Sequence, residues 1–243
     1  MRGGVIPTIA CINKATIPLG VDFDSLISAL QRYVDDHLAP VWGTPAKLVK
    51  TTKLRQDAWT LLFVDTANAM RKIRADLEKI FGKNIVSEIE AYHLVNGRPV
   101  ALVFVKNVLA DRSVPRIPDK ISMAASHELA EMLVDPANDL WCEHGKGMLY
   151  AYEICDAVEA KHFRVNGLAM TDFVYPAYFE AFRKRNSVQF DHLNEVKRPF
   201  QILKDGYAPV KKAGKLILLS APKKRRELRK ENRDLHRSEF RKR

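Results

Sequence analysis

The chain has 243 residues, of which 47% are apolar and 28% are charged. These values are ordinary for a soluble globular protein, and the length allows one large domain with a sizeable core. No run of about 18 apolar residues occurs, which argues against a membrane span. Prolines and polar residues interrupt the N-terminal apolar stretch early, which argues against a secretory signal. Three cysteines do not make a disulfide framework, so we expect a cytoplasmic protein with reduced thiols.

The net charge of +11 is spread unevenly along the chain. Residues 223–243 hold eleven basic and four acidic residues, a charge of +7, which leaves +4 for the rest. Such a segment can bind nucleic acid or another acidic surface, or it can be a solvated tail. It has a single aromatic residue, Phe240, and so offers no platform for stacking bases. We expect a folded domain over residues 1–210 and a basic C-terminal tail over residues 211–243.

In the first half of the chain, the patterns predict alternating strands and helices. Strands are expected over residues 5–12, 46–49 and 59–64, and helices over residues 22–38 and 68–80. Pro40 is expected to stop the first helix. The pair Asn96-Gly97 lies between two runs rich in β-branched residues, 85–94 and 100–108, and therefore predicts a hairpin.

The second half begins with an apolar helix over residues 122–134, bounded by Pro118 and Pro136. A loop containing Gly145 and Gly147 follows, and then a segment over 150–160 that is either helical or an irregular ligand-bearing stretch. Asn166-Gly167 predicts a second hairpin, residues 176–182 a short helix, and residues 200–209 a last edge strand. Strands and helices in this order indicate an α+β fold.

The helix over residues 122–134 carries a candidate metal site. His127 and Glu131 are four positions apart, so they point the same way, and Glu128 lies about 100° further round the helix. Zinc accepts imidazole nitrogen and carboxylate oxygen. This is the geometry of the zincin motif His-Glu-x-x-His, with Glu131 in place of the second histidine. The carboxylate makes the site harder and admits other divalent cations such as manganese, iron or calcium.

A second acidic stretch follows about twenty residues downstream. Glu153, Asp156 and Glu159 lie in a segment that is otherwise apolar. Burying three carboxylates is costly unless they bind a cation, whereas an exposed acidic helix face would need none. On a helix, Glu153 and Asp156 would share a face, so that one could complete the coordination sphere while the other orients a ligand.

Three stretches resemble those of a known family. Residues 126–131 match Ser-His-Glu-x-x-Glu, residues 135–136 match Asp-Pro, and residues 152–159 match Tyr-Glu-x-Cys-Asp-x-Val-Glu. This pattern resembles a family of uncharacterised bacterial and phage proteins regarded as zincin-like metallopeptidases. The resemblance covers about residues 5–210 and leaves out the basic tail. It implies a zincin-like α+β fold, a mixed sheet with the active-site helix packed on it, in a bacterial or phage-infected cell or in a virion.

The resemblance also implies roles for individual residues. By analogy with thermolysin-like enzymes, His127, Glu131 and Glu153 would bind zinc, and Asp156 would be a supporting or alternative ligand. Glu128 would be the general base. His192 could donate a hydrogen bond to the oxyanion of the transition state. The alternative for His192 is a structural histidine bonded to Asp191 or to the backbone.

Three functions are compatible with these residues. The first is a metal-dependent hydrolase, with a peptide or protein as substrate. The second is a non-catalytic zincin-like protein, such as a phage-associated one, in which the metal is structural. The third is binding of nucleic acid or an acidic surface through residues 223–243. A fourth protein ligand would favour the second function, since structural zinc sites are closed by the protein.

Overall fold

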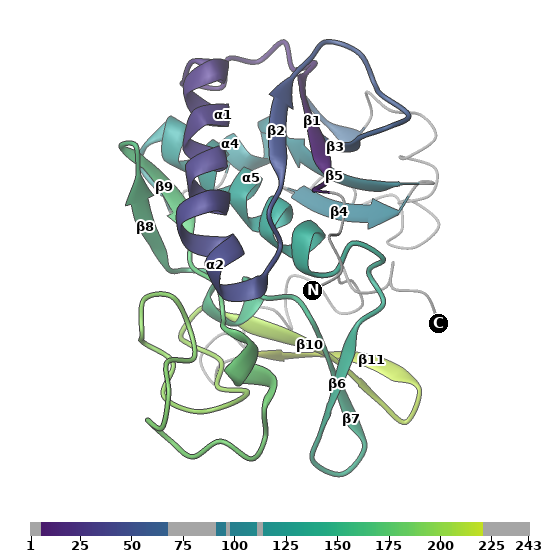
Figure 1. Ribbon diagram of the computed structural model, residues 1–243, viewed down its shortest axis with the longest axis vertical. Coiled ribbons are helices and arrows are strands. Elements are labelled where there is room, and N and C mark those ends of the chain that lie inside the picture. Colours follow the sequence, from purple (N-terminus) through teal and green to yellow (C-terminus); the bar gives the residue numbers. More distant parts are fainter. Residues whose placement is uncertain (1–5, 68–90, 96–97, 111–113, 221–243) are drawn as a thin grey trace.

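The computed structural model describes residues 6–67, 91–95, 98–110 and 114–220 (Figure 1). The main sheet has five strands in the order β2-β1-β3-β5-β4, in which β4 alone runs antiparallel to its neighbour. These strands are β1 (Thr8–Asn13), β2 (Lys47–Lys50), β3 (Trp59–Val64), β4 (Ala91–Val95) and β5 (Pro99–Phe104). The chain therefore has a mixed α/β fold with a largely parallel sheet, which agrees with the α+β prediction.

Helix α1 (Phe23–Arg32) packs on strand β2 and begins where the sequence predicts. The carboxylate of Asp22 caps it by accepting a hydrogen bond of 2.9 Å from the backbone N–H of Ser25. The prediction that Pro40 ends this helix is wrong. A π-helical segment, η1 (Tyr33–Leu38), leads into α2 (Ala39–Trp42), which ends at Gly43 in the left-handed conformation. Pro40 lies in the first turn of α2, where its missing N–H is tolerated.

Helix α5 (Ile117–Val134) packs on β4 and β5 and also touches α1 (Figure 1). It starts five residues before the predicted boundary at residue 122, because Pro118 is accommodated in its first turn. Its residues from Ala125 to Val134 are all buried. None of the described helices is long and apolar enough to cross a membrane.

Three polar side chains of α5 attach the helix to the hairpin of β8 (His162–Val165) and β9 (Leu168–Thr171). The backbone N–H of Ala169 donates to Asp119, and the Ser122 hydroxyl donates to the carbonyl of Ala169, at 3.1 and 2.6 Å. The N–H of Thr171 donates to Ser126 at 2.9 Å. Asp119, Ser122 and Ser126 are spaced three and four apart and so lie on one helix face. The Ser126 hydroxyl also donates to the carbonyl of Met123 in its own helix.

The later part of the chain forms a four-stranded antiparallel sheet in the order β11-β10-β7-β6. Its strands are β6 (Trp141–His144), β7 (Met148–Ala151), β10 (Tyr207–Lys212) and β11 (Lys215–Ser220). The sequence predicted a loop around Gly145 and Gly147, whereas the structure has a hairpin whose turn contains both. Residues 211–220, predicted as tail, belong to β10 and β11, so the domain extends beyond residue 210. The rest of the tail, 221–243, lies outside the described residues.

Three further predictions differ from the structure or fall outside it, and a fourth is confirmed. The strand predicted over residues 100–108 ends at Phe104, and α4 (Val105–Ala110) follows it. The helix predicted over residues 68–80 lies outside the described residues. The second predicted hairpin, around Asn166-Gly167, is confirmed by β8 and β9. Residues 176–179 form a single 3₁₀ turn, η4 (Pro176–Phe179), in place of the short helix.

Candidate metal centre

Helix α5 turns His127 and Glu131 toward one point. Nε2 of His127 lies 3.2 Å from Oε1 of Glu131, and the two residues are 6% and 0% exposed. This contact follows from their spacing of four residues on a helix. The helix therefore presents an imidazole and a carboxylate together, as the sequence predicts.

The segment after β7 brings a second carboxylate to the same point. Oδ1 of Asp156, at the start of the 3₁₀ turn η3 (Asp156–Val158), lies 3.2 Å from Nε2 of His127. The backbone N–H of Cys155 donates to Oε1 of Glu131 at 3.2 Å. One ligand atom from each of His127, Glu131 and Asp156 lies within 4.8 Å of the others. Of the two forms predicted for residues 150–160, the irregular one is observed.

Backbone hydrogen bonds hold this segment against the rest of the domain. The N–H of Val174 donates to the carbonyl of Ile154 at 2.8 Å, and the N–H of Leu203 donates to the carbonyl of Ala157 at 2.9 Å. Gly206 lies so close that a Cβ atom there would be 2.4 Å from the carbonyl oxygen of Ala157. The backbone around Asp156 is thus held by hydrogen bonds and close packing.

Glu153 lies within the same acidic cluster but outside this trio. It is 4% exposed, and its negative charge raises the pKa of both Glu131 and His93. The resemblance implies Glu153 as the third ligand and Asp156 as a supporting or alternative ligand. In the structure Asp156 contacts the imidazole of His127, while Glu153 adds negative charge nearby.

His93, which was not predicted from the sequence, joins the cluster from the edge strand β4. Its Nδ1 atom lies 3.4 Å from Oε2 of Glu128 and 3.9 Å from Oε2 of Glu131, and it is 2% exposed. Pairing with Ala101 fixes its place in the sheet, and the side-chain amide of Asn138 donates to its backbone carbonyl at 3.5 Å. A histidine in an otherwise apolar strand was a weak signal, because the strand pattern did not show which helix would pack on it.

The electrostatics of the cluster follow from its burial. Loss of solvent, together with the charges of Asp156 and Glu153, raises the pKa of Glu131 to about 8 against the opposing effect of His127. Burial alone would lower the pKa of His93, but the contact of its Nδ1 atom with Glu128 at 3.4 Å and the charges of the surrounding carboxylates outweigh it, so the net shift is upward. Both shifts show that several carboxylates lie close together in a buried site.

His192 lies in a different set of contacts from the acidic cluster. Its Nε2 atom is 3.0 Å from Nδ1 of His37, and its Nδ1 atom is 3.1 Å from the hydroxyl of Tyr175. Burial, and then the charge of His37, lower its pKa to about 4. Asp191, its expected partner, instead accepts hydrogen bonds from the backbone of Glu195 and Val196. Thus both ring nitrogens of His192 already contact polar groups of the protein.

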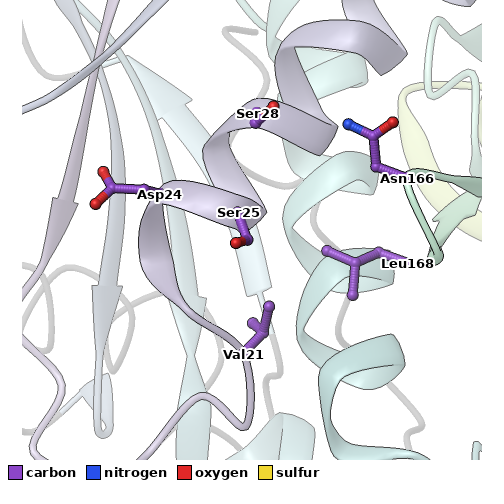
Figure 2. A pocket seen from close by; sticks show the side chains of 6 residues that line it. All are labelled: Val21, Asp24, Ser25, Ser28, Asn166 and Leu168. Carbon is purple, nitrogen blue, oxygen red and sulfur yellow. The ribbon is translucent and has the colours of Figure 1, made fainter.

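Figure 2 shows a surface pocket between α1 and the turn of the β8–β9 hairpin. The residues that line it are Val21, Asp24, Ser25, Ser28, Asn166 and Leu168. None of them belongs to the acidic cluster. Its one carboxylate, Asp24, already pairs with Lys50 at 2.6 Å. The pocket is therefore separate from the candidate metal centre.

Comparison of the chain with protein-family models, with curated proteins and with solved structures found no match. The function must therefore be inferred from the residues of the site. Oε2 of Glu131 and both ring nitrogens of His93 are buried without a hydrogen bond to the described residues. Imidazole and carboxylate groups suit zinc, manganese and iron. A divalent cation fits this set of donor atoms.

Proposed function

We propose that this protein is a metal-dependent hydrolase of the zincin type, with a peptide or protein as substrate. The observation that supports it best is the meeting of His127, Glu131 and Asp156 within 4.8 Å, although Asp156 comes from a segment well beyond the helix. Helix-borne ligands completed by a later acidic residue are the arrangement expected of a zincin.

In this proposal each residue of the cluster has a distinct task. His127, Glu131 and Asp156 hold the cation, which, when bound, would polarise a substrate carbonyl and lower the pKa of a water molecule. Glu128 would serve as the general base that accepts a proton from water and passes it to the leaving amine. Nδ1 of His93, at 3.4 Å from Oε2 of Glu128, orients this carboxylate.

The edge strand β4 supports a peptide as the substrate class. Among the described residues, β4 pairs with β5 on one side and with no strand on the other. An extended peptide can pair with such an edge through main-chain hydrogen bonds. Because His93 of this strand points into the cluster, a peptide paired there would pass close to Glu128.

A structural metal is the second candidate, and the burial of the cluster favours it. His127, the most exposed member, is 6% exposed, and Glu128, Glu131 and Asp156 are 0% exposed. Structural sites are closed by protein ligands, whereas catalytic sites keep a position open to water and substrate. In that case the cation would hold α5 and the segment around Asp156 together.

Two measurements test these candidates in order. Metal analysis of the purified protein should find at least one equivalent of divalent metal, and His127→Ala should lose one equivalent while the exposed-histidine control His162→Ala keeps it. Wild-type protein that takes up no zinc or manganese would rule out both candidates.

A protease assay on casein and on a peptide library then separates them. Hydrolysis by the wild type that falls at least a hundredfold in Glu128→Gln supports the hydrolase. A metal-loaded wild type without hydrolysis, whose melting temperature drops when the metal is removed, supports the structural role.

A further inference from the structure

A second trio of metal-capable side chains adjoins the first. One ligand atom from each of His93, Glu128 and Glu131 lies within 4.8 Å of the others. Glu131 is common to both trios: its Oε1 atom faces His127 at 3.2 Å, and its Oε2 atom faces His93 at 3.9 Å. The two oxygens of a single carboxylate thus point toward two different imidazoles.

Unsatisfied buried atoms point to a ligand in the second trio. His93 is 2% exposed, and neither ring nitrogen makes a hydrogen bond to the described residues. Oε2 of Glu131 is fully buried and likewise makes none. A buried polar atom without a hydrogen bond costs roughly 1–3 kcal/mol, so its persistence calls for an explanation such as an ion. Coordination would satisfy an imidazole nitrogen and the carboxylate oxygen at once.

Formal charge gives a further reason for two cations. The cluster contains four buried carboxylates, those of Glu128, Glu131, Glu153 and Asp156, together with the imidazoles of His93 and His127. With neutral imidazoles, the charge of two divalent cations would match that of these four carboxylates. Unbalanced buried charge is strongly unfavourable.

The geometry points to a second divalent-cation site made by His93, Glu128 and Glu131, so that the cluster is a two-cation centre bridged by the carboxylate of Glu131. Paired metals in enzymes lie about 3.5–4 Å apart, a separation that one bridging carboxylate can span. The mixture of imidazole and carboxylate ligands suits manganese, iron or zinc. This inference goes beyond the proposed function, which needs the first site only. When the second site is filled, Glu128 is a ligand.

The test is a metal titration of the full chain with Zn²⁺ alone and with Mn²⁺ alone, read by bound equivalents per chain. We expect two equivalents for the wild type and one for His93→Ala, while His162→Ala, with its exposed imidazole, keeps two. Because the readout is metal content, the result is independent of hydrolysis. If His93→Ala does not fold, His93→Gln is used, since it keeps a polar group of similar reach but lacks the imidazole nitrogen.

The spectrum of the manganese-loaded protein provides a second readout. Two Mn²⁺ ions that share a carboxylate are magnetically coupled, so the wild type should give a coupled paramagnetic resonance spectrum and His93→Ala the spectrum of an isolated ion. A wild type that saturates at one equivalent, or a folded His93 variant that binds as much metal as the wild type, would overturn the two-cation centre. Neither result would contradict the first site. That site would be contradicted by a wild type that binds no metal at all.

Discussion

Oδ1 of Asp156 lies 3.2 Å from Nε2 of His127, so a carboxylate from an irregular segment meets the imidazole of helix α5. Asp156→Asn keeps the side-chain shape but removes the charge. We expect this variant to lower zinc affinity at least tenfold, because an amide is a weaker ligand than a carboxylate. Competition with a chromophoric chelator measures the change.

Glu143→Gln is the matched control for Asp156→Asn, since it also converts an acid to its amide but at an exposed position. Its affinity for zinc should equal that of the wild type. Equal affinities for Asp156→Asn and the wild type would remove Asp156 from the first site and leave Glu153 as the remaining acidic ligand from this segment.

Metal binding should release a proton near neutral pH. The pKa of Glu131 is raised to about 8 in the metal-free protein, by burial and then by the neighbouring carboxylates, so Glu131 is largely protonated at pH 7. A cation needs the carboxylate, and the proton must leave as the metal binds. Apparent affinity should therefore rise by up to about tenfold per pH unit between pH 6 and 8 and level off above.

Calorimetric titration at pH 7 in two buffers of different ionisation enthalpy counts these protons. In Glu131→Gln the proton contributed by this residue should vanish, together with most of the affinity. An affinity that is constant from pH 6 to 8 would show that Glu131 is already ionised before the metal arrives.

The close approach of Gly206 to the ligand-bearing segment makes a third prediction. A Cβ atom there would lie 2.4 Å from the carbonyl oxygen of Ala157 and 3.0 Å from that of Asp156. Both neighbours are backbone, so they cannot rotate away. Gly206→Ala should push the turn at Asp156 outward, lowering stability by about 1–3 kcal/mol and also weakening metal binding.

Gly214→Ala is the control for this prediction. Gly214 has a φ of +77°, and nothing lies within 4 Å of its Cβ position, so alanine there is strained but does not press on the metal centre. Its cost should be about 1–2 kcal/mol of stability, with unchanged zinc affinity. Denaturant unfolding and chelator competition measure the two effects separately, and a Gly206 variant with wild-type affinity would contradict the prediction.

Local sequence patterns predicted many of the helices and strands. The strand predicted over residues 59–64 has its observed bounds, because a run of apolar and β-branched residues ends there at Asp65 and begins shortly after Asp57. His127 and Glu131 meet because four-residue spacing on a helix fixes their relative position without any knowledge of the fold. Such short-range rules do not depend on which elements pack together.

Long-range contacts account for what the sequence did not reveal. His93 enters the cluster only because β4 pairs with β5 and α5 packs on both strands. Asp156 contacts His127 because of the turn at η3, which is held by backbone hydrogen bonds to residues from distant parts of the chain. Strands β6 and β7 were not predicted because they have only four residues each and are partly exposed. Strand β11 was not predicted because it lies in the region that was assigned to the basic tail.

The buried acid Asp172 makes protein stability depend on pH. Burial, followed by the neighbouring charge of Asp191, raises the pKa of Asp172 to about 8, although its Oδ1 atom accepts hydrogen bonds from the backbone of Phe173 and Leu193. In the unfolded chain the ordinary value is near 3.8. Between pH 4 and 8 the folded state thus holds a proton that the unfolded state has lost. The free energy of unfolding should fall as pH rises through this window, by at most about 1.4 kcal/mol per pH unit.

Asp172→Asn isolates this effect, because the amide oxygen can still accept from Phe173 and Leu193 while the titrating group is gone. Measurements on zinc-loaded protein keep Glu131 from titrating in the same range. Urea unfolding at pH 5, 7 and 9 should show that the free energy of unfolding of the variant, relative to that of the wild type, increases with each rise in pH. The reason is that the wild type must either keep its proton at increasing cost or bury a charge beside Asp191. If the two stability curves run parallel from pH 5 to 9, Asp172 is ionised in the folded protein and the prediction is wrong.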